Sequence, residues 1–154
     1  MTYRVEGLSP EPFRSLFALS DQALEARAMR RVRATAPGRF PCRVALRDAD
    51  EGDVLILLNH VSHDAPTPYR AAYAILVGER AGAARFVDEP PPVAECRTLG
   101  LRGFDRDGML RAALLAMPGE ADARIRELLE DEAVLSVHLH NAAHGCFLAR
   151  AERC

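Results

Sequence analysis

The sequence predicts an α+β protein, a single domain in which a largely antiparallel β-sheet has a few helices packed on it. Short apolar runs separated by turn residues recur along the chain, and the helical patterns lie mainly near its two ends. The length of 154 residues is that of one ordinary domain, so we expect one globular unit over residues 1–154. An apolar content of 49% with 27% charged residues is typical of such a domain.

Charge and hydropathy exclude several classes of partner. A formal net charge of −2 provides no electrostatic basis for binding nucleic acid or an anionic membrane. No apolar run, residues 54–58 included, is long enough to cross a bilayer. The start of the chain lacks a secretory pattern, and the four cysteines form no Cys-x-x-Cys pair. We therefore expect a cytoplasmic protein with reduced thiols.

The N-terminal region is predicted to hold an edge strand and two short helices. Residues 2–6 alternate between apolar and polar side chains, as a strand does. Ser9 followed by Pro10 is typical of a helix start, with serine as N-cap and proline in the first turn. Ser20 predicts a second helix that runs to about residue 28, and residues 30–33 fit either a helix or a strand.

The middle of the chain is predicted to be mainly strands. Val44 and Leu46 alternate with arginines over residues 43–47, which indicates a strand, and residues 54–58 are apolar on both faces, as in a central strand. Pro66 and Pro68 exclude regular structure from the loop that follows. Further strands are expected at 72–77 and, more weakly, at 84–87, with a helical turn at 93–98. Asp-Gly between two apolar runs predicts a hairpin of residues 99–104 and 109–115.

A helix over residues 120–131 and a hairpin that begins at residue 134 are predicted to complete the fold. In the hairpin, Leu135, Val137 and Leu139 alternate with Ser136, His138 and His140, which places both imidazoles on one face of the strand. Residues 141–145 are expected to form the turn, and residues 146–150 the returning strand.

The His-x-His spacing is one candidate for chemistry. Two histidines that point to the same side of a strand can bind zinc or iron, and His144 would be the third protein ligand, with His60, His63 or Cys146 as further choices. The alternative is that these histidines face solvent or are satisfied within the core.

A thiol site is the second candidate. Gly145 permits a sharp turn that would bring Cys146 near an imidazole, and an adjacent imidazolium favours the nucleophilic thiolate. The alternative is a small buried cysteine with no reactivity. Arg43 and Arg70 are the arginines expected to hold a carboxylate or phosphate by paired hydrogen bonds, against the alternative of ordinary surface arginines.

Several fragments together resemble an uncharacterised bacterial family, a domain of unknown function. They are Pro41-Cys42-Arg43, Pro68-Tyr69-Arg70, Phe104-Asp105 with Gly108-Met109, and His138-Leu-His140-Asn141-Ala142 with Gly145-Cys146. Tyr73 stands where members of the family often have histidine. The resemblance implies no activity, substrate or cofactor. It implies only a set of residues to test as one cluster: Cys42, Arg43, Arg70, His138, His140 and Cys146.

From the sequence we expect a pocket for a small anionic molecule, with catalysis left open. His138, His140, Cys146 and Cys42 are the expected acid/base or nucleophilic groups, while Arg43, Arg70, Tyr69 and Asn141 are expected to bind the ligand. A metal, if bound, is expected at His138, His140 and His144. The competing hypothesis is a non-catalytic binding or assembly module in which the same residues are structural. A homo-oligomer is compatible with both hypotheses.

Overall fold

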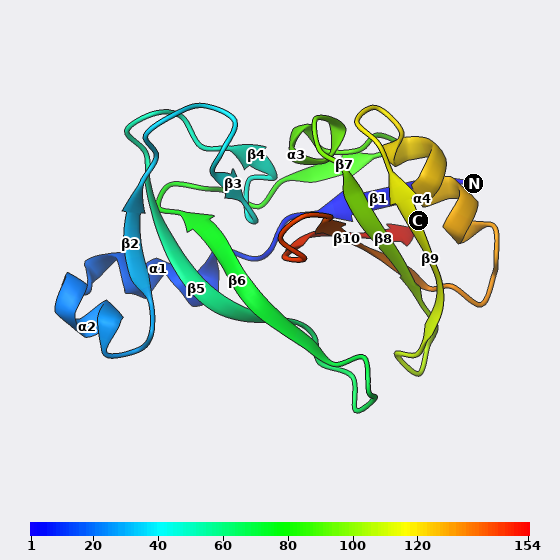
Figure 1. The fold of residues 1–154 in the computed structure, drawn as a ribbon, viewed down its shortest axis with the longest axis horizontal. Helices are drawn as coiled ribbons and strands as arrows, with labels where there is room; N and C mark the ends of the chain where they lie inside the picture. The colour runs from blue at the N-terminus through cyan, green and yellow to red at the C-terminus, as the bar shows by residue number, and fades with distance from the viewer.

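The computed structural model describes residues 1–154 and contains two β-sheets that stand on opposite sides of the molecule (Figure 1). The larger sheet has six strands, in the spatial order β7 (Arg85–Val87), β1 (Tyr3–Glu6), β11 (Phe147–Arg153), β10 (Ser136–Asn141), β8 (Leu99–Phe104) and β9 (Leu110–Ala116). The smaller sheet has five, in the order β2 (Arg30–Arg33), β5 (Val54–His63), β6 (Ala71–Gly78), β3 (Pro41–Cys42) and β4 (Arg47–Asp48). All neighbouring strands are antiparallel except β3 and β6. This arrangement confirms the predicted α+β class.

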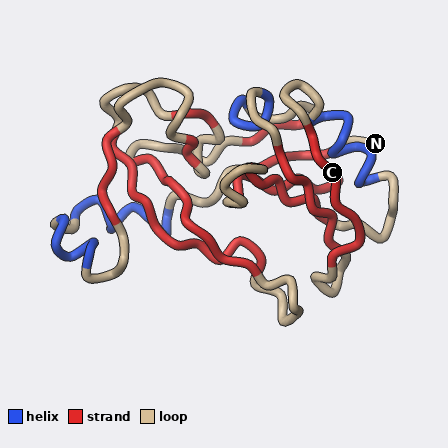
Figure 2. The backbone as a smooth tube through the Cα atoms, viewed as in Figure 1, coloured by secondary structure: helices blue, strands red, loops and turns tan.

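The helices are short and lie around the sheets (Figure 2). They are α1 (Glu11–Arg14), the 3-10 helix η1 (Ser15–Ala18), α2 (Asp21–Glu25), α3 (Pro92–Glu95) and α4 (Ala121–Leu129). None of them combines the length and the apolar composition needed to cross a membrane.

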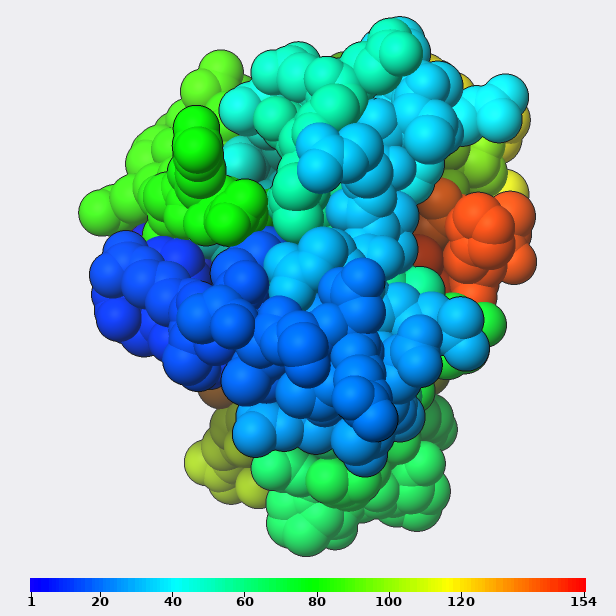
Figure 3. Space-filling view, turned by 90° about the vertical axis from the view of Figure 1, so that its left-hand side faces the viewer, coloured from blue at the N-terminus to red at the C-terminus, as the bar shows by residue number.

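Each sheet has its own apolar core. The core of the six-stranded sheet contains 18 buried residues, to which α4 contributes Ala121, Ile125, Leu128 and Leu129. The core of the five-stranded sheet contains 11, including Leu16 from η1. Figure 3 shows the N-terminal segment, in blue, covering the outer side of the five-stranded sheet. Because the cores are separate, the space between the two sheets is available for other side chains.

The predicted hairpins and most of the predicted strands are present. Residues 30–33 form a strand rather than a helix, and β8 pairs with β9 across the Asp-Gly turn. Ser20 caps α2 as expected, accepting a hydrogen bond from the main-chain N–H of Ala23 (3.1 Å). β5 is central in its sheet but continues to His63, five residues beyond the apolar run.

Five predictions about local structure are wrong. The predicted strand 43–47 is mostly a turn between β3 and β4, in which Leu46 adopts a left-handed conformation (φ 52°) to reach the larger core. The N-cap of α1 is Pro10 rather than Ser9, and α2 ends at Glu25. β1 is internal rather than an edge strand, because β7 and β11 pair with its two sides. The strand after the last turn begins at Phe147, one residue beyond Cys146.

Three irregularities in strand pairing occur where side chains enter the space between the sheets. They fall between Val61 and His63 of β5, between Leu139 and His140 of β10, and between Gly103 and Phe104 of β8. An extra residue in one strand changes which face the next side chain occupies. The bulge in β5 thus lets both His60 and His63 face the other sheet, although they are three positions apart and would lie on opposite faces of a regular strand.

Candidate functional site

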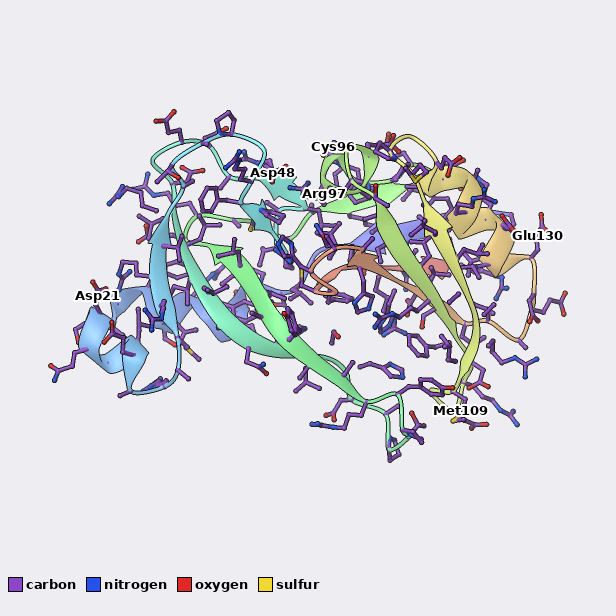
Figure 4. All side chains as sticks on the ribbon, viewed as in Figure 1. Asp21, Asp48, Cys96, Arg97, Met109 and Glu130 are labelled. Carbon is purple, nitrogen blue, oxygen red and sulfur yellow. The ribbon has the colours of Figure 1, made fainter.

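Side chains tie the two sheets together at both ends of the gap between them. At one end, Arg97, which follows α3, forms a bidentate ion pair with Asp48 of β4 (Nη2–Oδ1 2.6 Å, Nη1–Oδ2 3.0 Å; Figure 4). At the other end, the β5–β6 and β8–β9 hairpins meet. The carbonyl of Gly108 accepts hydrogen bonds from His63 Nε2 (2.9 Å) and Thr67 Oγ1 (3.2 Å).

Arg43 lies in the turn between β3 and β4 and is almost completely buried, with 3% of its surface exposed. Its Nε–H donates to the main-chain oxygen of Phe147 (2.8 Å) and its Nη1 to that of Pro41 (2.7 Å). Its Nη2 lies 3.1 Å from Sγ of Cys146. These contacts use three of the five N–H groups of a guanidinium, so two remain free.

The charge of Arg43 has no carboxylate partner. None of the ion pairs in the structure includes it. Burial lowers the pKa of Arg43, and interaction with the sulfur of Cys146 offsets part of that effect. Burying a charge without a counter-charge raises the free energy of the folded state, so the surroundings of Arg43 favour the binding of an anion.

A cavity of about 520 Å³ opens beside Arg43, which we call the arginine cavity. It lies between β6 and the β10–β11 turn and contains three arginines, a tyrosine, an asparagine, a histidine and a thiol among apolar side chains. Its lining consists of Gly38, Arg39, Pro41, Arg43, Leu57, Tyr73, Ala74, Ile75, Leu76, Arg97, Asn141, His144 and Cys146.

The β10–β11 turn places Cys146 at the cavity wall. Oδ1 of Asn141 accepts hydrogen bonds from the main-chain N–H groups of Ala143 (3.1 Å) and His144 (3.2 Å), which closes the turn. Gly145 then adopts φ 76°, a conformation that glycine tolerates best. Cys146 is 8% exposed and keeps its Sγ against Arg43.

A second group of side chains, the histidine cluster, fills the gap next to the arginine cavity. It consists of His60 and His63 from β5 and His138 and His140 from β10, packed around Phe104 and Phe147. The His63 ring stacks on Phe104 with centroids 4.0 Å apart and meets the edge of His138 at 5.2 Å. Phe147 contacts His60, His138 and His140 at 5.6–6.0 Å.

The two predicted histidines are buried and neutral. Burial lowers the pKa of His138 to about 3 and that of His140 to about 4. Nδ1 of His140 lies 3.0 Å from the carbonyl of Gly145, so this nitrogen carries the proton. Nδ1 of His138 is buried without any hydrogen-bond partner. Neither ring has the near-neutral pKa that suits a general base at pH 7.

Phe147 separates the histidine cluster from the arginine cavity. Its ring packs on the imidazoles, while its main-chain carbonyl accepts the Nε–H of Arg43. His138 and His140 do not line the cavity. The single pocket predicted from the sequence is therefore two adjacent regions, one with Arg43 and Cys146 and the other with the paired histidines.

The remaining predicted residues are distributed around these regions. His144 and Asn141 line the arginine cavity. Cys42 is buried and lines a different cavity, where its Sγ accepts hydrogen bonds from the main-chain N–H groups of Ala45 (3.4 Å) and Gly78 (3.2 Å). Tyr69 and Arg70 lie in the β5–β6 hairpin loop, with Tyr69 exposed beside the ring of Phe104 and Arg70 paired with Asp64 (2.8 Å).

No group of three or more His, Cys, Asp or Glu side chains is placed to hold a metal ion. The ring centroids of His138 and His140 are 6.4 Å apart, and His144 is on the cavity side of the turn.

The family model for "Protein of unknown function (DUF1203)" matches residues 39–153. The chain belongs to the DUF1203 family. The matched region includes every residue of the histidine cluster and all of the arginine cavity except Gly38. Neither a curated protein nor a solved structure gave a match.

Sequence analysis did not single out Arg39 or Arg97 as part of the site. Every basic residue of this DUF1203 protein is an arginine, so the residue type carried no signal. Tyr73 also lines the arginine cavity. The sequence predicts the strand that carries Tyr73, but it assigns this side chain no role in the site.

Proposed function

We propose that the arginine cavity of this DUF1203 protein binds a small anionic molecule, such as a carboxylate or a phosphate. The observation that supports this function is the burial of Arg43 without a carboxylate. Two of its N–H groups remain to donate, and a planar fork of donors suits both carboxylate and phosphate oxygens.

The other cavity residues fit an anion of modest size. Arg39 adds a second positive charge at the rim, whereas Arg97 is already neutralised by Asp48. Leu57, Ile75 and Leu76 supply apolar surface for a short hydrocarbon portion. The volume of about 520 Å³ is within the usual range for small-ligand pockets.

Thermal unfolding in the presence of sulfate, phosphate or succinate, compared with chloride at equal ionic strength, tests this function. An anion at ten times its Kd stabilises the folded protein by about 1.4 kcal/mol, which raises Tm by about 4 °C for a chain of this size. Calorimetric titration at 25 °C should give the same Kd. An equal Tm in all salts would contradict the proposal.

Two substitutions in β6 locate the binding. Ala74 lines the cavity and is exposed, so Ala74→Glu places a carboxylate beside Arg43 without disturbing a core. We expect it to remove the anion-dependent rise in Tm. Ala72→Glu makes the same change at an exposed alanine outside the cavity and should retain that rise. Arg43→Met should also abolish it, provided that circular dichroism shows a folded protein.

A further inference from the structure

Cys146 is the one thiol that contacts a buried arginine, Arg43, in the wall of a cavity. Its Sγ lies 3.1 Å from Nη2 of Arg43. An N–H of Arg43 Nη2 can donate to this sulfur, and the thiolate is the nucleophilic form of a cysteine. The same guanidinium has N–H groups free for a carboxylate, so one residue can act on both the nucleophile and the ligand.

The other three thiols provide an internal comparison. Cys42 is as buried as Cys146, but its sulfur accepts main-chain N–H groups, and carboxylates including Asp48, Asp50 and Asp53 line its cavity. Cys96 is exposed and lies 3.3 Å from an Arg97 that already pairs with Asp48. Cys154 is exposed at the C-terminus. Only Cys146 is buried, lines a cavity and has its sulfur within hydrogen-bond distance of an arginine that lacks a carboxylate partner.

We propose that Cys146 is a nucleophile for small carboxylic acids that carry an electrophilic carbon, with Arg43 holding the carboxylate. This inference rests on the proposed function, since it requires the anion to bind in the arginine cavity. In the reaction the thiol loses its proton to solvent, the thiolate electron pair forms a carbon–sulfur bond, and the leaving group departs with the pair of its broken bond. The product is a thioether at Cys146.

Iodoacetate and iodoacetamide test the proposal, because they share the reacting carbon and the iodide leaving group and differ in charge. A thiolate without assistance reacts more slowly with iodoacetate, since both are negative. We expect the ratio of the iodoacetate rate to the iodoacetamide rate to be about tenfold higher at Cys146 than at Cys42 or Cys154, as one charge-assisted hydrogen bond would produce. Peptide mass spectrometry at low conversion measures all four cysteines in one sample.

Two variants sharpen the measurement. Ala74→Glu should lower the iodoacetate rate at Cys146 more than the iodoacetamide rate, because the new carboxylate competes for Arg43. Ala72→Glu should change neither rate. Succinate at saturating concentration should slow labelling of Cys146 and leave labelling of Cys154 unchanged.

The outcomes separate the two proposals. If anions raise Tm but the rate ratio at Cys146 equals that at Cys154, the nucleophile is overturned and anion binding stands. If Cys146 reacts with iodoacetamide, shows no preference for iodoacetate, and no anion raises Tm, both are overturned. A raised ratio at Cys146 that Ala74→Glu abolishes supports both.

Discussion

Arg43 and Arg97 show how similar side chains acquire different roles from their neighbours. Both are largely removed from solvent and both line the arginine cavity. The carboxylate of Asp48 compensates Arg97, which therefore serves as a link between the sheets. Arg43 has only carbonyl and sulfur partners, and its positive charge stays available to a ligand.

His138 and His140 also act at the scale of single residues, through the cost of burying an imidazole. Both pKa values are lowered, mainly by burial, and the nearby positive charges of Arg150 at His138 and Arg102 at both rings add to the effect, as does His63. The folded protein keeps these rings neutral to about pH 4, whereas the unfolded chain protonates them near pH 6.5. Stability is therefore complete above pH 6.5 and falls as the pH drops below it.

We expect the free energy of unfolding to fall by about 2 kcal/mol for each of these histidines between pH 7.5 and pH 5. Urea denaturation at the two pH values measures the change. His138→Leu should reduce this pH-dependent loss of unfolding free energy by about 2 kcal/mol. At pH 7.5 the substitution should change the free energy of unfolding little, because Nδ1 of His138 has no hydrogen-bond partner to lose. The same pH dependence in the variant and the original protein would contradict this account.

At the scale of elements, the tips of the β5–β6 and β8–β9 hairpins fit tightly against each other. Gly108 has φ 78°, and a Cβ added there would lie 2.3 Å from Cβ of Ala65, too close for two carbon atoms. The missing side chain allows the tips to approach and lets His63 and Thr67 donate to the carbonyl of Gly108. The position of the histidine cluster depends on this approach.

We expect Gly108→Ala to destabilise the protein by about 2–4 kcal/mol, through a left-handed backbone and a steric clash together. Gly119→Ala is the matched control, since Gly119 has φ 85° with open space around it. Gly119→Ala should lower the free energy of unfolding by only about 1–2 kcal/mol, the cost of the left-handed backbone conformation alone. Urea denaturation compares the two variants. Equal losses of unfolding free energy would mean that a Cβ at residue 108 makes no steric clash with the other hairpin.

At the scale of the whole molecule, the protein consists of two sheets with separate cores that are joined by polar contacts. The Asp48–Arg97 pair is the ion pair at one end of that junction, with side chains only 18% and 12% exposed. It also neutralises an arginine at the rim of the arginine cavity. The ion pair therefore contributes to the stability of the junction and also reduces the positive charge of the arginine cavity.

Asp48→Asn should lower the free energy of unfolding by about 2 kcal/mol, because it leaves the largely buried Arg97 without a counter-charge. Glu11→Gln, which removes a pair with Arg14 on the surface, should cost less than about 0.5 kcal/mol. If the proposed function is correct, Asp48→Asn should also tighten sulfate binding, since it frees a positive charge. Denaturation and calorimetric titration measure the two effects, and weaker sulfate binding would contradict the second.

The sequence by itself determined the α+β class, the main hairpins and the shared face of His138 and His140. These follow from local alternation and turn residues, which act over a few neighbouring positions. It also indicated Arg43 and Cys146, although not that they touch. The turn at residues 43–46 escaped prediction because Leu46 leaves the alternating pattern to reach a core formed by distant strands.

Only the tertiary structure decided how these residues are grouped. Arg43 and Cys146 are 103 residues apart in the chain and meet because β3 and the β10–β11 turn lie at the junction of two sheets. The same packing assigned Cys42 to another cavity and enclosed the histidines behind Phe147. Whether a charge is compensated depends on contacts between remote segments, and local patterns carry no information about those contacts.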